Sequence, residues 1–303
     1  MDSIGRVRKC GESMSDGKML RVAQLNMGSL LEPHWDRRRL EILAWLERLD
    51  PDVVCLQEVW ETGPGTNTAG WLADHAAPGR WHWCFGGYPL PEEAWADRSL
   101  LFGSAILSRW PIERHRVFAL PVDLAPADPH PSYRMQAELL HAHTAGIDAY
   151  STHLAPPPAQ AYHRVRQVLA IDEAIRATWD PATAMPAILC GDFNAKPQSD
   201  EMRYLNANAV IEGRSTYYVD GWATLRPTEA GYTLDPLTNP QARFLNVPAQ
   251  RIDYLLVGDP FLRPGGAGRI LNTDLAFHES LTGPLASDHY GLVADIAWPQ
   301  RPD

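Results

Sequence analysis

Hydrophobic residues gather in short runs along the chain, and most of these runs end in a polar residue. Such runs, flanked by glycine, proline or charged residues, are typical of buried strands. We therefore expect strands at 21–26, 53–58, 103–109, 133–141, 147–153, 187–190, 251–257 and 292–296. Two longer stretches, 33–50 and 159–179, instead repeat apolar residues at helical spacing. Strands and helices in this order are typical of a layered α/β protein.

Two stretches lack a regular pattern. Residues 63–100 are dense in aromatic residues separated by proline and glycine, and we expect short strands and loops there. Most of these aromatic side chains should fill a core between layers, and the alternative is that Tyr88 or Trp95 lies at the rim of a site. Residues 213–251 are rich in Pro, Asn, Thr and Gly and should be mostly loop.

Composition indicates a soluble globular protein, because 45% of the 303 residues are hydrophobic and 21% are charged. No internal repeat or linker is visible, so we expect a flexible leader over 1–19 and a single domain over 20–303. No stretch approaches the roughly 18 unbroken apolar residues of a membrane span. The first twenty residues lack the apolar core of a secretory signal. We therefore expect a cytoplasmic protein, and we also expect a monomer.

Cysteine content and charge narrow the function further. The four cysteines are too few and too scattered for a disulfide framework, so Cys55 and Cys190 should be small apolar core residues. The formal net charge of −10 disfavours a protein that coats nucleic acid by charge alone. It does not exclude an enzyme that meets a phosphate through divalent cations.

A polar pair follows the strand expected at 187–190. Gly191 should let the backbone turn there. Asp192 and Asn194 stand one residue apart, so on an extended chain both side chains point to one side. Polar groups at the end of a strand are a common place for ligands and chemistry, whereas Asp and Asn also commonly stabilise turns. The pair alone leaves both interpretations open.

Similar polar residues lie at the ends of five further strands. The six segments are Gln24-Leu25-Asn26, Leu56-Gln57-Glu58-Val59, Ser151-Thr152-His153-Leu154, Gly191-Asp192-Phe193-Asn194, Arg251-Ile252-Asp253-Tyr254 and Ser287-Asp288-His289. Together they resemble the motif series of the endonuclease/exonuclease/phosphatase superfamily. That superfamily includes pancreatic-type deoxyribonucleases, abasic-site endonucleases, neutral sphingomyelinases, inositol polyphosphate 5-phosphatases and deadenylases. The resemblance runs from about residue 20 to about residue 297.

The resemblance implies a fold and a metal. The fold would be α/β (α+β) and DNase-I-like, a four-layer sandwich of two packed mixed β-sheets flanked by helices, with the site at one edge. Glu58 would be the main Mg²⁺ ligand, with Asn26 close by, and Asp288 would lie at that metal or at a second metal position. Mg²⁺ takes one or two protein carboxylates and keeps several waters, so one glutamate is sufficient. Mn²⁺ is an expected substitute.

The resemblance also implies catalytic roles. Asp192 would orient or deprotonate the attacking water, and Asn194 would hold that water or a phosphate oxygen. His289, oriented by Asp253, would face the phosphate as acid, base or charge stabiliser, and His153 would donate to a non-bridging oxygen. The metal and both histidines would meet the charge that builds up on the phosphoryl group. The sequence leaves open whether Asp192 or His289 is the base, and whether one or two metals bind.

Two departures from the family pattern bear on the substrate. Ser104 stands where relatives often carry Asn, and Leu234 follows Thr233 where many relatives carry an aromatic residue. Leu234 and the overall acidity count against a nucleic acid, which needs a basic and aromatic track. We therefore favour a phosphate-ester substrate that is a small molecule or a lipid head group. Four arginines are candidates to line its pocket, although solvated ion pairs are their commoner role: Arg98, Arg134, Arg164 and Arg166.

These observations favour a Mg²⁺-dependent hydrolase that cuts a phosphodiester bond, or alternatively a phosphomonoester, by direct attack of water. A DNA or RNA endo- or exonuclease of the same superfamily is the first alternative. A non-catalytic member that uses the fold to bind a partner is the second. The presence of Glu58, Asp192 and His289 favours an enzyme over the binding protein.

Overall fold

The computed structural model describes residues 19–28, 30, 32–63, 65–90, 99–122, 136–180, 183, 185–259, 261 and 266–299. The predicted leader, apart from residue 19, lies outside these residues. The predictions for Trp95, Arg98 and Arg134 lie outside them as well.

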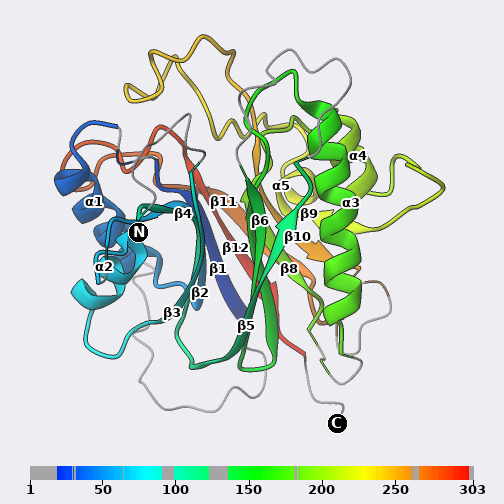
Figure 1. Cartoon of the computed structure of the whole chain (residues 1–303), viewed down its shortest axis with the longest axis horizontal. Helices are drawn as coiled ribbons and strands as arrows, with labels where there is room; N and C mark the ends of the chain where they lie inside the picture. The colour runs from blue at the N-terminus through cyan, green and yellow to red at the C-terminus, as the bar shows by residue number, and fades with distance from the viewer. Residues whose placement is uncertain are drawn as a thin grey trace, which may run out of the picture.

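Two six-stranded sheets pack face to face in the middle of the molecule (Figure 1). The first sheet has the order β11-β12-β1-β2-β4-β3. Its strands are Met19–Asn26 (β1), Val53–Glu61 (β2), His82–Pro89 (β3), Leu101–Ser108 (β4), Ile270–Ala276 (β11) and Gly291–Ala297 (β12). Strand β1 runs parallel to β2, and the other pairs are antiparallel, so this sheet is mixed.

The second sheet has the order β5-β6-β7-β8-β10-β9. Its strands are Ile112–Leu120 (β5), Ala137–Thr144 (β6), Ile147–His153 (β7), Ile188–Asp192 (β8), Tyr218–Asp220 (β9) and Asp253–Gly258 (β10). Strand β7 runs parallel to β8 and the remaining pairs are antiparallel. Both sheets are therefore mixed, as predicted.

Helices cover the outer faces of both sheets (Figure 1). Helices α1 (Trp35–Leu49) and α2 (Thr68–His75) pack on the first sheet, and their apolar residues share one core cluster with β1, β2 and β4. Helices α3 (Ala161–Thr178) and α4 (Asp200–Leu205) pack on the second sheet in the same way. A short helix, α5 (Gly221–Leu225), follows β9. The four-layer sandwich expected from the sequence is confirmed.

Three layers of hydrophobic core explain why the strands are apolar on both faces. In β1, Leu20 and Val22 pack between the sheets, whereas Ala23 and Leu25 pack against the helices. A strand that is covered on both faces has no solvated side, so its sequence is a continuous apolar run rather than an alternating one. Cys55 and Cys190 lie in the central layer as free, fully buried thiols, as predicted.

Several elements differ from those that the sequence pattern predicts. Helix α2 and strand β11 were not predicted, and β9 and α5 lie within the stretch 213–251 that was expected to be loop. Gly191 was expected to turn the chain, but it lies inside β8. A Cβ there would lie 2.1 Å from the carbonyl oxygen of Thr152. Glycine is required by close strand packing at this position, and not by a turn. None of the helices in the described ranges is long and apolar enough to cross a membrane.

Candidate active site

The polar strand ends meet at one edge of the sandwich. Asn26 ends β1, His153 ends β7 and Asp192 ends β8. Strand β10 begins at Asp253, which lies opposite Asp192 in the antiparallel register, and His153 lies opposite Asp192 on the other side. Three neighbouring strands of the second sheet therefore place a histidine and two carboxylates side by side.

Glu58 reaches the same edge through a β-bulge. The register between β2 and β4 shifts between Leu56 and Val59, and both of these residues pack in the outer core against the helices. Gln57 and Glu58 together occupy the position of one residue, and Glu58 adopts a left-handed backbone with φ +55°. The prediction that Glu58 lies at the strand tip was wrong, because β2 continues to Glu61. A left-handed non-glycine residue costs about 1–3 kcal/mol.

Asn26 connects the two sheets at the site. Its Nδ2 donates to Glu58 Oε1 at 3.2 Å and to Asp192 Oδ2 at 3.1 Å. Its Oδ1 accepts from the backbone N–H of Gly28 at 3.0 Å, which fixes the orientation of the amide. A neutral amide thus separates the half-buried carboxylate of Glu58 from the buried carboxylate of Asp192, which would otherwise repel each other.

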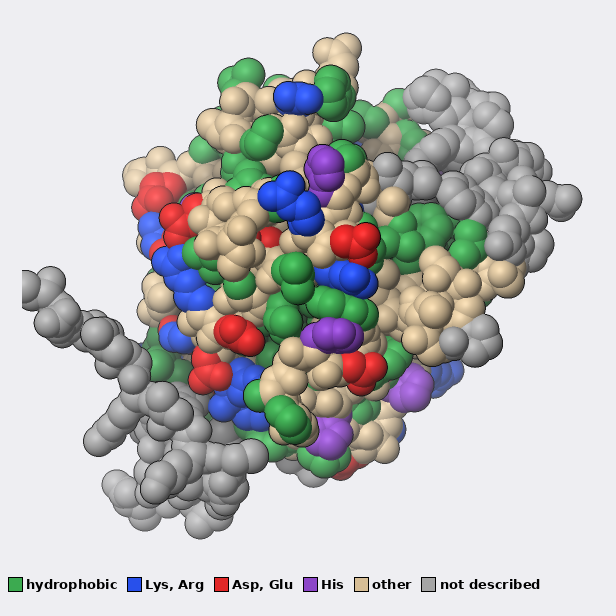
Figure 2. All heavy atoms as spheres, turned by 90° about the vertical axis from the view of Figure 1, so that its left-hand side faces the viewer, with side chains coloured by type: hydrophobic (Ala, Val, Ile, Leu, Met, Phe, Trp, Pro, Cys, Tyr) green, Lys and Arg blue, Asp and Glu red, His purple; other side chains and the backbone are tan. Residues whose placement is uncertain are grey.

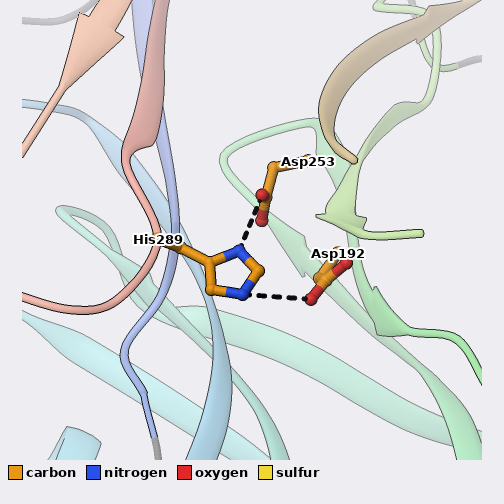
Figure 3. A group of neighbouring side chains, drawn as sticks. All are labelled: Asp192, Asp253 and His289. Carbon is orange, nitrogen blue, oxygen red and sulfur yellow. Dashed lines mark hydrogen bonds and ion pairs between the residues drawn. The ribbon is translucent and has the colours of Figure 1, made fainter. Parts of the chain in front are cut away.

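Asp253 and His289 form a buried dyad (Figure 3). His289 Nδ1 lies 2.9 Å from Asp253 Oδ2, and Gln24 Nε2 donates to Asp253 Oδ1 at 2.9 Å. The backbone N–H of Asp253 donates to Thr233 Oγ1 at 3.2 Å. The other imidazole nitrogen, His289 Nε2, lies 3.8 Å from Asp192 Oδ2. The dyad therefore turns one nitrogen of His289 towards the centre of the site.

The electrostatics of the dyad favour the charged imidazolium. Burial alone lowers the pKa of His289, but the carboxylates of Asp253, Asp288 and Asp192 outweigh burial and raise this pKa well above its ordinary value. In contrast, burial lowers the pKa of His153, and the charge of Asp192 raises it by less than burial lowers it. The surroundings of the two histidines therefore differ: those of His289 favour its protonated form, and those of His153 favour its neutral form.

Asp192 is the centre of the constellation. Its Oδ2 accepts from Asn26 and lies 3.5 Å from His153 Nε2. Its Oδ1 accepts from the backbone N–H of Asn194 at 2.8 Å, which closes an Asx turn. Burial, and next the charge of Asp253, raise the pKa of Asp192 to about 6. Asp192 therefore stabilises a turn and also lies among the other polar strand ends.

Asn194 does not point along the same direction as Asp192. Its backbone is left-handed, with φ +49°, and its Nδ2 donates to the carbonyl oxygen of Leu154 at 3.1 Å. The expectation that both side chains project to one side was wrong, because it assumed an extended chain. Asn194 is nevertheless half-buried beside the site and lines a pocket next to it.

Asp288 lies on the loop that precedes β12 and contributes a second carboxylate near Glu58. Its Oδ1 accepts from Ser287 Oγ at 3.1 Å, and its carbonyl accepts from Asn239 Nδ2 at 2.9 Å. Burial, and next the charge of Asp288, raise the pKa of Glu58 to about 7. A carboxyl group whose ionisation is disfavoured by a neighbouring carboxylate is suited to bind a cation.

The donor set fits a hard divalent cation. Glu58 and Asp288 offer carboxylate oxygens and Asn26 lies next to them, which is the oxygen chemistry that Mg²⁺ prefers. A second group, Asp192, Asp253 and His289, also has ligand atoms within 4.8 Å of one another. Both oxygens of Asp253 already accept hydrogen bonds from Gln24 and His289, however. Glu58, Asp288 and Asn26 are therefore the residues with oxygens that could hold a cation.

Several buried polar residues support the site, and no role was predicted for them. Gln24 and Gln57 are hydrogen-bonded to each other at 2.8 Å, and Gln57 Nε2 donates to Ser151 Oγ at 2.9 Å. Gln24 and Ser151 stand two residues before Asn26 and His153, so they share the face that points between the sheets. This spacing is a signal that would have identified them. The buried guanidinium of Arg38, bonded to the carbonyl of Met27 at 2.7 Å, carried no such signal.

The remaining candidates from the sequence lie away from the centre. Tyr88 is buried and packs edge-on to Phe102, whose ring centroid lies 6.2 Å from that of His153. Arg166 lies 3.8 Å from Glu212 on the surface, as expected for a solvated ion pair. Arg164 was expected to be solvated as well, but it is buried and bonded to Glu201 at 2.7 Å.

The face formed by α1 and α2 carries acidic and basic side chains in alternation (Figure 2). Several of these charges pair with each other, including Arg39 with Asp36, Arg80 with Asp50 and Arg48 with Glu279. A surface of paired charges offers little attraction to a polyanion. The described part of this face therefore gives no basic track for nucleic acid.

The order of the motifs and their convergence agree with a family comparison. The model of the Endonuclease/Exonuclease/phosphatase family matches residues 23–289. The chain belongs to this family. Its members are hydrolytic enzymes that act on phosphate esters. A comparison with curated proteins gave no match.

Solved structures of this family share the fold. An endonuclease/exonuclease/phosphatase from Beutenbergia cavernae is 23% identical with a TM-score of 0.67, over 93% of this chain and 72% of that one. TDP2 from D. rerio, complexed with a single-strand DNA product, is 19% identical with a TM-score of 0.67, over 93% and 100% of the two chains. The human Nocturnin catalytic domain with a bound sulfate anion is 19% identical with a TM-score of 0.62, over 92% and 94%. These likenesses establish the DNase-I-like fold.

Proposed function

We propose that this protein hydrolyses a phosphodiester bond by direct attack of water, with Mg²⁺ as its cofactor. The observation that supports the proposal best is the linkage of both sheets at the site. Asn26 contacts Glu58 on one side and Asp192 on the other, and Asp192 in turn lies 3.8 Å from the His289–Asp253 dyad. A cation site, a base and a charged imidazole are thereby held within a few contacts of one another.

Glu58 and Asp288 would hold the cation, with Asn26 beside it. When bound, Mg²⁺ would supply a positive charge that offsets the negative charge on the phosphoryl oxygens. The remaining chemistry is assigned to the side chains of this chain. Asp192 would accept a proton from the attacking water as the water oxygen forms its bond to phosphorus and the bond to the departing oxygen breaks. The departing oxygen would take a proton from solvent.

His289 and His153 would stabilise the transition state. The imidazolium of His289, held by Asp253, would face the non-bridging oxygens and offset their charge, and His153 would donate a hydrogen bond to one of them. Asp192 is the better candidate for the base because the carboxylates around His289 favour its protonated form. Asn194 would hold the water or a phosphate oxygen only after its side chain leaves the carbonyl of Leu154.

The test is hydrolysis of bis-(p-nitrophenyl) phosphate. Excess EDTA should abolish the reaction, and Mg²⁺ or Mn²⁺ should restore it. Asp192→Asn should lower kcat by about 10²-fold or more, the effect of one general acid–base group, while Asp274→Asn, an exposed carboxylate on β11, should leave it unchanged. Full turnover in EDTA would remove the cation from the mechanism. Complete inactivity of the wild type with every phosphate ester would favour the non-catalytic binding protein.

A substrate panel distinguishes a nuclease from an enzyme that acts on a small molecule or a lipid. Plasmid DNA, RNA, sphingomyelin and small phosphomonoesters should be compared at equal enzyme concentration. We favour a small molecule or a lipid head group over a polynucleotide, because the described part of the face formed by α1 and α2 lacks a basic track. Efficient cleavage of long DNA or RNA would instead assign a nuclease.

A further inference from the structure

A pocket of about 610 Å³ opens beside the candidate active site, with Asn194 in its wall. The chain that follows His153 forms one side of this pocket, and the first turn of α3 forms the next. The segment after β8 and residues 247–250 close it. We call it the side pocket. Asn194 is two residues from Asp192 and lines this pocket, so the pocket adjoins the candidate active site.

Lys196 gives the side pocket a positive charge that no neighbouring acidic group in the described ranges pairs with. Its ammonium group is exposed and makes no hydrogen bond or ion pair among the described residues. The other charges of the pocket are paired: Arg164 with Glu201 at 2.7 Å, and Asp200 with Arg203 at 3.1 Å. The side pocket therefore attracts one negative group, two residues along the chain from Asn194.

Tyr162 supplies an aromatic face. Its side chain is 47% exposed although it is large and apolar, and it lines the pocket at the start of α3. An exposed aromatic ring next to a free cation is suited to stack on a planar ring of a ligand that also carries an anion. Pro156, Val165 and Val247 add apolar walls.

We propose that the side pocket binds one nucleotide unit of the substrate, with its base on Tyr162 and its second phosphate on Lys196. This inference rests on the proposed function and narrows its substrate to a short nucleotide with two phosphates. A cationic choline head group would be repelled by Lys196. An inositol polyphosphate would require several cations, and a long strand would require a continuous basic track.

The first experiment compares three dinucleotides that differ only in a terminal phosphate: TpT, pTpT and TpTp. Products are separated by chromatography, so that cleavage of the internal diester is distinguished from loss of the terminal phosphate. One of the phosphorylated dinucleotides should have a kcat/KM about fivefold above that of TpT, the scale of one exposed ion pair. Lys196→Met should remove this advantage and Lys196→Arg should keep it. Arg269→Met, which removes an exposed cation just before β11, is the matched control and should also keep it.

The salt dependence of the reaction and the effect of Tyr162 on KM provide two further measurements. Neither should change if Lys196 and Tyr162 only support the fold. The wild-type advantage of the phosphorylated dinucleotide should shrink as ionic strength rises, and Lys196→Met should lose this salt dependence. Tyr162→Ala should raise KM for TpT about tenfold with little change in kcat, and Tyr162→Phe should behave like the wild type. Neither variant should change the hydrolysis of methyl p-nitrophenyl phosphate, which has no base and no second phosphate.

The outcomes separate this inference from the proposed function. Equal kcat/KM for all three dinucleotides, or an advantage that survives in Lys196→Met, would overturn the inference. Hydrolysis of methyl p-nitrophenyl phosphate and sphingomyelin without any dinucleotide cleavage would overturn it as well, while the proposed function stands. Failure with every ester would contradict the proposed function itself.

Discussion

Asn26 of the first sheet donates its amide N–H to Asp192 of the second sheet at 3.1 Å. The same Nδ2 contacts Glu58, so one neutral side chain separates two carboxylates, one half-buried and one buried. Aspartate has almost the same shape as asparagine but carries a negative charge and no N–H donor. The neutral amide is therefore the property that this position requires.

Asn26→Asp should therefore destabilise the metal-free protein. The new carboxylate would lose both donated hydrogen bonds and meet two like charges in a buried place, for which we expect a loss of about 2 kcal/mol or more. Urea unfolding with and without Mg²⁺ measures this loss of stability, and the cation should restore part of it. Unchanged stability without the cation would contradict the proximity of the three residues.

Glu58→Gln should weaken cation binding more than it changes the fold. The variant should require at least tenfold more Mg²⁺ for half-maximal activity, and Mg²⁺ should raise its Tm less than that of the wild type. Asp192→Asn provides the contrast, because it should lower kcat with little change in the Mg²⁺ requirement. If both variants shift the Mg²⁺ requirement equally, the separate roles of these carboxylates are wrong.

Asp253 and His289 should act as one unit. Asp253→Asn should lower kcat by about 10²-fold or more, because the imidazole loses both its orientation and its charge partner. In a His289→Ala background the same substitution should have almost no further effect on kcat. Additive losses in the double variant would show that Asp253 acts through something other than the imidazole.

Glu138 should make the stability of the protein fall as pH rises. This carboxyl lies buried between the sheets, where its Oε1 accepts from the backbone N–H of Ser104 at 2.8 Å, and burial raises its pKa to about 8. The unfolded chain ionises near pH 4.5, so between pH 4.5 and 8 the folded state binds the extra proton. The contribution of Glu138 to the free energy of unfolding therefore decreases through that window, by up to about 5 kcal/mol, and is constant below it.

Glu138→Gln should remove this decrease. Urea unfolding at pH 4.5 and pH 8 should show similar stability at the lower pH and a more stable variant at the higher pH. A variant that is less stable than the wild type at pH 8 would mean that the ionised carboxylate of Glu138 is stabilised in the fold.

Gly191→Ala should be strongly destabilising. Its Cβ would lie 2.1 Å from the carbonyl oxygen of Thr152, so β7 and β8 would have to separate at the position next to Asp192. We expect a loss of about 3 kcal/mol. The matched control is Gly146→Ala, which has nothing within 4 Å and only a left-handed backbone with φ +75°, and it should cost about 1 kcal/mol. Equal effects of the two substitutions would show that β7 and β8 are not closely packed at Gly191.

The local pattern of the chain determined most of the strands and the polar residues at their ends. Asn26, His153 and Asp192 could be placed because an apolar run that stops at a polar residue marks a strand end, and Asp253 because such a run begins there. Motif order then indicated the family. The short elements α2, β9 and β11 were missed because their sequences lack a strong period.

Only the tertiary structure decided how the strand ends meet. The bulge at Glu58 depends on its register with β4, and the contact of Asn26 with Asp192 depends on how one sheet packs on the other. The side pocket at Lys196 depends on three segments that are distant in sequence: 156–165, 194–201 and 247–250. Register and packing are interactions between remote parts of the chain, so no local pattern of residues records them.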